Sequence, residues 1–268
     1  MNQTVLITGA SSGIGAELVK IFAAEGCNLV LVARSEERLN QLAVELQKNA
    51  PIRATILAKD LSKPFAAEEI FTALQAQNIS VDILVNSAGY GTHGRFDRLD
   101  LGEELAMLDV NVLSLVKLTR LFLPGMVVRG YGRILNLGST GSFSPTPLMA
   151  SYGGSKAFVL FFSEALSEEL KGTGVTVTAL CPGVTRSGFQ ERSNITGIRL
   201  LRGPVMTPQE VAQTGYQSLM RGQAVVIPGL FNWMISFLVR VFPRSLVRWA
   251  SFQSLKSDLP SKNKPAMR

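Results

Sequence analysis

The chain has 268 residues, of which 46% are hydrophobic and 18% charged, a composition that excludes a disordered or fibrous protein. Two cysteines, Cys27 and Cys181, and one histidine, His93, exclude a disulfide framework and a metal site of the usual Cys/His spacing. The net charge of +7 is uneven, since residues 1–228 carry 20 basic and 19 acidic side chains and residues 229–268 carry 7 and 1. A nucleic-acid-binding protein would carry its basic patch on the folded body, so we expect no nucleic-acid partner.

The first residues lead directly into an apolar run, with neither a basic segment nor a cleavage site that would mark a targeting signal. No stretch of 18 or more apolar residues occurs, so a membrane-spanning helix is not expected. We therefore expect a cytoplasmic protein. The basic C-terminal end leaves open a local contact with an acidic surface or anionic lipid.

In chain order, short runs rich in Val, Ile and Leu alternate with longer amphipathic segments. The runs predict strands over 4–8, 28–32, 52–57, 82–86, 133–137, 175–180 and 224–227. They lack strict alternation, as is typical of parallel strands buried on both faces. Helices are predicted over 14–25, 36–48, 65–77, 102–129 and 152–171. The alternation predicts an α/β fold: a single Rossmann-like, doubly wound parallel sheet of about seven strands with helices on both faces.

A glycine-rich segment joins the first strand to the first helix and reads Thr8-Gly9-Ala10-Ser11-Ser12-Gly13-Ile14-Gly15. Gly9 permits a tight turn, Gly13 lets the backbone approach a pyrophosphate, and Gly15 lets the helix pack on the sheet. The free N–H groups and the positive end of that helix bind phosphates. The context of strand, turn, helix and βαβ unit therefore predicts a dinucleotide site.

The residue after the second strand discriminates between dinucleotides. An acid there would bind the ribose hydroxyls of NAD, but this chain has Arg34 followed by Ser35. Arg34 can pair with a 2′-phosphate and Ser35 can add a hydrogen bond, so NADP(H) is favoured over NAD(H). The alternative is that Arg34 is a solvated surface residue and that Ser35 only caps the next helix.

Tyr152 and Lys156 begin the last long predicted helix and share one face, because residues four apart do so. A nearby ammonium group lowers the pKa of a tyrosine from about 10, so Tyr152 is expected to act as an acid or base near neutral pH. Ser139 follows the fifth strand, at the carboxyl end of the sheet where such folds bind ligands. Its hydroxyl can hold a substrate oxygen beside Tyr152.

These motifs resemble the short-chain dehydrogenase/reductase family from about residue 4 to 189, and more loosely to 228. Further matches in the family's order are Asp60-Leu61, Asn86-Ser87-Ala88-Gly89, Asn111 and Pro182-Gly183. The resemblance implies that Tyr152 exchanges a proton with the reacting oxygen and that Ser139 orients that oxygen. It also implies that Lys156 binds the nicotinamide ribose and that Asn111 holds a water linked to Lys156.

The resemblance implies cofactor contacts along the whole sheet edge. Asp60 and Leu61 are expected at the adenine, and Thr185 or Ser187 replaces the threonine that often binds the carboxamide in the family. The expected cofactor-binding residues are Thr8, Gly9, Ser11, Ser12, Gly13, Ile14, Gly15, Arg34, Ser35, Asp60, Leu61, Asn86, Ala88, Gly89, Tyr152, Lys156, Pro182, Gly183, Thr185 and Ser187.

The function expected from these residues is an NADP(H)-dependent oxidoreductase that interconverts a carbonyl and an alcohol, with carbonyl reduction as the favoured direction. A lipophilic ketone, an aldehyde or a 3-oxoacyl thioester would fit as substrate, and the resemblance implies a homodimer or homotetramer. The alternative is a non-catalytic nucleotide sensor or scaffold on the same fold, because a fold alone does not establish function.

The domain prediction is one Rossmann-like catalytic unit over residues 1–228, with a substrate loop at 184–207, a helical extension at 229–255 and a frayed tail at 256–268. The extension is crowded with apolar residues and with Arg240, Arg244 and Arg248, and Pro243 should divide it into two helices. Three roles remain open for 229–252: a peripheral membrane contact, a pocket wall that is also a subunit interface, or a helix pair packed on its own domain. His93 is expected as an exposed loop residue, and both cysteines as buried apolar residues.

Overall fold

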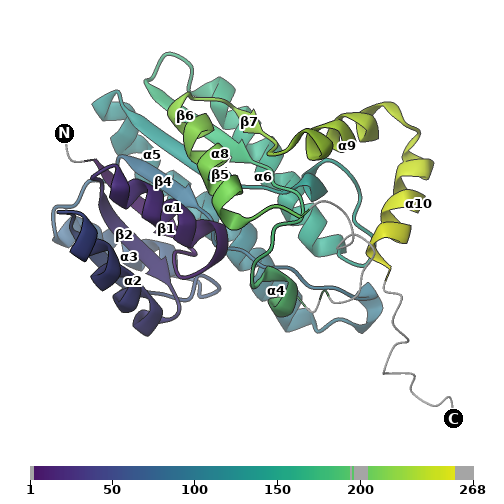
Figure 1. The fold of residues 1–268 in the computed structure, drawn as a ribbon, viewed down its shortest axis with the longest axis horizontal. Helices are drawn as coiled ribbons and strands as arrows, with labels where there is room; N and C mark the ends of the chain where they lie inside the picture. The colour runs from purple at the N-terminus through teal and green to yellow at the C-terminus, as the bar shows by residue number, and fades with distance from the viewer. Residues whose placement is uncertain (1–2, 194, 196–204, 257–268) are drawn as a thin grey trace, which may run out of the picture.

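A seven-stranded parallel sheet in the order β3-β2-β1-β4-β5-β6-β7 forms the centre of the molecule, in a computed structural model that describes residues 3–193, 195 and 205–256 (Figure 1). The strands are β1 (Thr4–Thr8), β2 (Asn28–Ala33), β3 (Ala54–Ala58), β4 (Ile83–Asn86), β5 (Gly132–Leu137), β6 (Val175–Leu180) and β7 (Val225–Val226). All seven lie within three residues of their predicted bounds. The doubly wound α/β prediction is therefore confirmed.

Helices cover both faces of the sheet. One face packs against α1 (Gly13–Ala24), α2 (Glu36–Asn49) and α8 (Pro208–Met220), and the other against α3 (Ala66–Ala76), α5 (Ser114–Arg129) and α6 (Ala150–Glu169). Each face has its own hydrophobic core: the first lies under α1, α2 and α8, and the second under α3 and α5. Successive side chains of a strand point to opposite faces, so Val5 and Ile7 lie in the first core and Leu6 lies in the second. Cys27 and Cys181 are both buried, as expected.

Two features of the helices differ from the prediction. The predicted helix 102–129 is divided into α4 (Leu101–Leu108), a π-helical turn η2 (Asp109–Leu113) and α5. Helix α8 was not predicted, although its start is encoded by a reciprocal cap in which Thr207 binds the Glu210 N–H and Glu210 binds the Thr207 N–H. Pro208 occupies its first turn, where a missing N–H costs nothing.

One helical stretch of the described chain, Leu101–Arg129, is long and apolar enough by composition to cross a membrane. It contains α4, η2 and α5, and Leu118, Phe122 and Met126 on α5 are buried in the second core. In this fold the buried side of α5 therefore packs on the sheet, whereas Leu105, Leu113 and Val128 of the same stretch are exposed.

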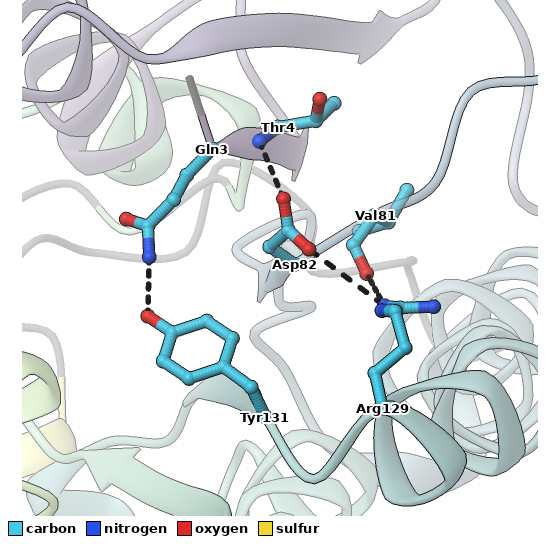
Figure 2. Close-up of polar contacts among 6 residues, drawn as sticks. All are labelled: Gln3, Thr4, Val81, Asp82, Arg129 and Tyr131. Atoms are coloured by element: carbon cyan, nitrogen blue, oxygen red, sulfur yellow. Dashed lines mark hydrogen bonds and ion pairs between the residues drawn. The ribbon is translucent and has the colours of Figure 1, made fainter. Parts of the chain in front are cut away.

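A polar network ties the first strand to the amino-terminal edge of the sheet (Figure 2). The Thr4 N–H donates to the Asp82 carboxylate (2.9 Å), and the Arg129 guanidinium donates to the Val81 carbonyl (2.7 Å). The Gln3 side chain donates to the Tyr131 hydroxyl (2.6 Å). These contacts hold the edge opposite the glycine-rich turn, so they leave the carboxyl ends of the strands free for a ligand.

The C-terminal extension is a pair of helices, α9 (Leu230–Val241) and α10 (Arg244–Leu255), separated at Pro243 as predicted. Figure 1 shows the pair at the edge of the molecule, in yellow-green beyond β7. The segment predicted as a substrate loop contains a four-residue helix, α7 (Phe189–Arg192), and a bridge between Thr185 and Met206. Residues 194 and 196–204 of that loop, and 257–268 of the predicted tail, lie outside the described residues.

Candidate active site

A cavity of about 600 Å³ lies at the carboxyl ends of the central strands, where the sequence predicts the ligand site. Most of the predicted residues meet in its wall. They are Gly9, Ser11, Ser12, Gly13, Ile14, Gly15, Arg34, Ser35, Asp60, Leu61, Ala88, Gly89, Ser139, Tyr152, Lys156, Pro182, Gly183, Thr185 and Ser187. Thr8, Asn86 and Asn111 are placed behind the wall.

The glycine-rich turn is shaped by close approaches that exclude side chains. Gly9 has a φ of +68°, and a Cβ there would lie 2.9 Å from Ala88 Cα. A Cβ on Gly15 would lie 2.4 Å from the Gly9 carbonyl oxygen. Ser12 begins α1 without a side-chain cap, and the first turn of that helix holds no acidic residue. Its N–H groups therefore face the cavity as a site for an anion.

At the end of β2, Arg34 has no hydrogen-bond or ion-pair partner among the residues that the structure describes, and it lines the cavity. Ser35 accepts the Arg38 N–H (3.4 Å) as the cap of α2, so the capping role considered for it is present. Burial would raise the pKa of Asp60, but hydrogen bonds from Ser62 and the charges of Arg34 and Lys63 hold it below its usual value. This end of the cavity therefore holds the Arg34 cation near an ionised carboxylate, with neither a hydrogen bond nor an ion pair between the two.

Ser139, Tyr152 and Lys156 form the predicted cluster where β5 meets α6. The Lys156 Nζ lies 5.9 Å from the centre of the Tyr152 ring and donates to the Leu137 carbonyl (2.7 Å). Ser139 is held by the next turn, because its Oγ accepts the Gly141 N–H (3.0 Å). The three side chains come from a strand end and one helix face, as their spacing predicts.

The expected lowering of the Tyr152 pKa by Lys156 is not found. Burial raises the pKa of Tyr152 to about 12, and a hydrogen bond with Ser139 offsets only part of that effect. Burial likewise lowers the pKa of Lys156 to about 8, because the ammonium form loses its hydration. The tyrosine hydroxyl thus stays protonated and uncharged throughout the physiological range.

Asn111 lies in the π-helical turn and is held by both backbone groups of Tyr90. Its Nδ2 donates to the Tyr90 carbonyl (2.9 Å), and its Oδ1 accepts the Tyr90 N–H (3.1 Å). A Cβ on Gly89 would lie 3.0 Å from Asn111 Oδ1 and 3.3 Å from Lys156 Nζ. Asn111 and Lys156 therefore both lie beside Gly89. Asn111 does not line the cavity itself, but it fixes the Tyr90 backbone next to the lining residue Gly89.

The side chains of Thr8 and Asn86 likewise make hydrogen bonds within the fold and do not line the cavity. The Thr8 Oγ1 accepts the N–H groups of Ser87 (3.0 Å) and Ala88 (3.1 Å), which joins the ends of β1 and β4. The Asn86 Nδ2 donates to Asn136 Oδ1 (2.9 Å) in the adjacent strand. Both side chains shape the cavity wall from behind.

The structure adds lining residues that the sequence did not single out. Met149, Phe189, Ile195 and Leu255 form an apolar cluster with Tyr152, and the rings of Tyr152 and Phe189 lie 5.4 Å apart. Leu255 comes from the end of α10, more than 100 residues away along the chain, so no local pattern could reveal it.

Two charged or polar residues also take unexpected positions. Arg192 lies 4.3 Å above the ring of Tyr90 and lines the cavity, and burial together with the charge of Arg34 lowers its pKa. His93 is half-buried, and its Nε2 lies 2.9 Å from the Leu255 carbonyl oxygen. The expectation of an exposed His93 is wrong because α10 returns to that loop.

Known proteins share this fold and much of this sequence. The family described as short chain dehydrogenase matches residues 3–196. The very-long-chain 3-oxoacyl-CoA reductase of Mus musculus is 35% identical over 258 residues, covering 92% of this chain and 81% of that protein. The ketoacyl reductase HetN of a Nostoc species is 32% identical over 230 residues, covering 84% and 78%.

A solved short-chain dehydrogenase from Sphingobium yanoikuyae, in complex with NADPH, superimposes with a TM-score of 0.80 at 32% identity and covers 98% of this chain and 99% of that one. The match to the family spans the glycine-rich turn and the whole Ser139, Tyr152 and Lys156 cluster. The chain belongs to the short-chain dehydrogenase family of oxidoreductases.

Proposed function

We propose that the protein is an NADP(H)-dependent reductase that converts a lipophilic ketone, of the 3-oxoacyl thioester class, to the alcohol. The observation that carries the proposal is one cavity that holds Arg34, without a hydrogen bond or ion pair among the described residues, at one end and the Ser139, Tyr152 and Lys156 cluster at the other.

The residues present fit a phosphorylated dinucleotide. The uncapped start of α1 and the close approach of Gly9 and Gly15 suit a pyrophosphate, and Arg34 suits a 2′-phosphate. An acid that would repel that phosphate is missing from the end of β2. Arg192 adds a second positive charge near Arg34, and both favour NADP(H) over NAD(H).

When bound, the nicotinamide group supplies the hydride. The chain's own task is to hold the ketone and to provide the proton. Ser139 donates a hydrogen bond to the ketone oxygen, and the Tyr152 hydroxyl transfers its proton to that oxygen as it becomes an alcohol. A Tyr152 pKa of about 12 keeps this proton on the hydroxyl at neutral pH, so the donor is in the form that reduction needs. Lys156 and Asn111 position the cluster from behind.

The substrate end of the cavity is apolar. Met149, Phe189, Ile195 and Leu255 surround Tyr152, and their side chains suit an acyl chain or another bulky lipophilic group. Relatives named as ketoacyl and very-long-chain 3-oxoacyl-CoA reductases support the 3-oxoacyl class.

The proposal includes a cytoplasmic homodimer or homotetramer. Exposed apolar side chains lie on α4 and on α6, among them Leu105, Phe158 and Phe161. Such a surface is typical of subunit contacts, because water-exposed apolar area is buried on association.

Parallel titrations of the purified protein with NADPH and NADH, followed by turnover assays with 3-oxoacyl thioesters, test the proposal. Tight NADPH binding, weaker NADH binding and NADPH oxidation on addition of the thioester are expected. Binding without turnover of any ketone would favour a nucleotide sensor instead, and the absence of binding would contradict the proposal.

A further inference from the structure

The helix pair α9 and α10, called the arm below, presents an unusually apolar outer surface. Of the 23 large hydrophobic side chains that are exposed in the described chain, 12 lie between Leu230 and Phe252. Contiguous apolar surface of this extent marks an interaction site in a protein that is stable in water.

The polarity of α9 is inverted relative to an ordinary surface helix. The least exposed residues of α9 are mainly polar, since Asn232 donates to the Pro228 carbonyl (2.7 Å) and Ser236 is buried, with Val239 half-buried beside them. Arg240 is exposed, and its guanidinium lies 5.4 Å from the centre of the Phe143 ring. Trp233 and Phe237 point outward with their rings stacked. A helix that packs only on its own domain buries its apolar stripe, so this outer face requires an apolar environment.

The arm is attached to the body by a few specific contacts. Asn232 fills the space beside Gly183, where a Cβ would come within 2.3 Å of its Oδ1. Val247 and Leu255 of α10 are buried, and the Leu255 carbonyl contacts His93. The apolar face is therefore presented outward by specific contacts at both ends of the arm.

The charge of the arm indicates what kind of partner covers its apolar face. Residues 229–256 contain Arg240, Arg244, Arg248 and Lys256 and no acidic residue. A symmetric contact between two copies of the arm would set this patch against itself and bring like charges together without a carboxylate in between. Anionic lipid headgroups supply the missing negative charge, and the acyl chains beneath them receive Trp, Phe and Leu side chains.

We propose that the outward face of α9 and α10 is a docking surface for an anionic lipid bilayer, on which the protein lies without spanning it. Leu255 at the end of the arm also lines the cavity, so the docked protein takes its lipophilic substrate beside the bilayer. This statement about the substrate rests on the proposed function, whereas the docking itself does not.

Tryptophan fluorescence of the full chain tests the docking directly. The protein has two tryptophans, Trp233 and Trp249, and both lie on the arm. Vesicles that contain phosphatidylglycerol should shift their emission to the blue, and lipids with brominated acyl chains should quench it. Vesicles of phosphatidylcholine alone should have much less effect, because the arm's positive charges then find no partner.

Two pairs of variants, measured by co-sedimentation with vesicles, separate the apolar and charged contributions. The double variant Phe231→Ser/Phe237→Ser should weaken binding at least about tenfold, since each buried aromatic side chain contributes strongly. Arg244→Gln/Arg248→Gln should weaken binding to anionic vesicles roughly 25-fold, at about fivefold for each charge. The matched controls on the body are Phe65→Ser/Phe96→Ser and Arg98→Gln/Arg221→Gln, which remove exposed side chains of the same types and should leave binding unchanged.

Unchanged tryptophan emission in the presence of anionic vesicles would overturn the proposal, and this measurement on the wild-type protein does not depend on the folding of any variant. A second copy of the chain would cover the arm instead if two results were found together. Tryptophan emission would shift with protein concentration in the absence of vesicles, and the mass in solution would be smaller for Phe231→Ser/Phe237→Ser than for the wild type. Because neither measurement needs turnover, failure of the docking and failure of the proposed reductase activity are distinguishable.

Turnover tests the link to the substrate. Phe231→Ser/Phe237→Ser should lower the rate with a long-chain 3-oxoacyl substrate dissolved in anionic vesicles, and leave the rate with a short, water-soluble ketone unchanged. Equal rates for the wild type and the variant on the vesicle-borne substrate would overturn this part.

Discussion

His93 donates a hydrogen bond from Nε2 to the carbonyl oxygen of Leu255, 162 residues further along the chain, at 2.9 Å. The carbonyl oxygen only accepts, so the ring carries its proton on Nε2. Leu255 lines the cavity and packs with Met149 and Ile195, so this bond joins the end of the arm to the substrate end of the site.

Replacement of His93 by Ala should loosen that wall without touching the reacting groups. We expect the KM for a long-chain ketone to rise roughly two- to tenfold, the range that one hydrogen bond spans. The kcat for a small ketone should stay within about twofold. His93→Gln keeps a side-chain donor and should restore most of the affinity. Equal KM values for wild type and His93→Ala would show that the bond does not shape the substrate site.

Tyr152→Phe removes the proposed proton donor and little else, because the ring keeps its contact with Phe189. Turnover should fall by a factor of roughly 10²–10⁴, and NADPH binding should persist. Steady-state rates and a fluorescence titration on the same preparation measure both quantities. A variant with wild-type turnover would remove Tyr152 from the mechanism.

Arg34→Asp replaces the cation that lines the cavity at the end of β2 with an anion. The Kd for NADPH should rise at least about tenfold, since a charge-assisted contact is lost and a repulsion is added, while NADH binding improves. Arg221→Asp makes the same change in net charge away from the cavity and serves as the control. If cofactor preference is unchanged in Arg34→Asp, the 2′-phosphate is held elsewhere.

The high pKa of Tyr152 predicts different pH profiles for the two directions of the reaction. Reduction needs the protonated hydroxyl, which persists until pH approaches about 12, so titration of Tyr152 should not lower the kcat/KM of reduction near neutral pH. Oxidation of the alcohol needs the deprotonated form, whose fraction rises about tenfold per pH unit below the pKa. Initial rates in both directions across a pH series measure this. Parallel profiles would contradict it.

Burial of Lys156 predicts a pH-dependent cost to stability. Its pKa is about 8 in the fold against 10.5 for the exposed group. Between these values the unfolded chain binds a proton that the folded chain releases, so this group's contribution to stability rises with pH. Below about pH 8 the full cost of the buried ammonium is present.

Lys156→Met removes that cost together with activity. The free energy of unfolding of the variant relative to wild type should be highest at neutral pH and decline by up to about 3 kcal/mol as the pH rises to about 10.5. Urea unfolding at several pH values measures the difference. The lost bond to the Leu137 carbonyl adds only a pH-independent penalty. If the difference in free energy of unfolding between Lys156→Met and wild type did not vary with pH, the lowered pKa of Lys156 would be contradicted.

Much of the site is predictable because it depends on local geometry. The turn from Gly9 to Gly15 needs glycines wherever a strand enters a helix over a phosphate, and Tyr152 and Lys156 lie on one face through their spacing alone. The alternation of buried runs and amphipathic segments predicts the parallel sheet, and with it the edge where Ser139 lies. Arg34 is predicted in the same way, since the end of β2 always meets that edge.

Other properties arise only when distant segments pack together. The pKa of Tyr152 is set by its burial, which depends on Phe189 and on neighbours that no spacing relates to Tyr152. The position of Leu255 depends on the path of the arm, and the outward orientation of Trp233 depends on which side of α9 meets Gly183 and Phe143. The sequence by itself thus determined the sheet, the glycine-rich turn and the spacing of Tyr152 and Lys156, because these follow from backbone periodicity. Only the tertiary structure decided the electrostatics of the site and the surface that the arm exposes, because desolvation depends on which groups exclude water around a side chain.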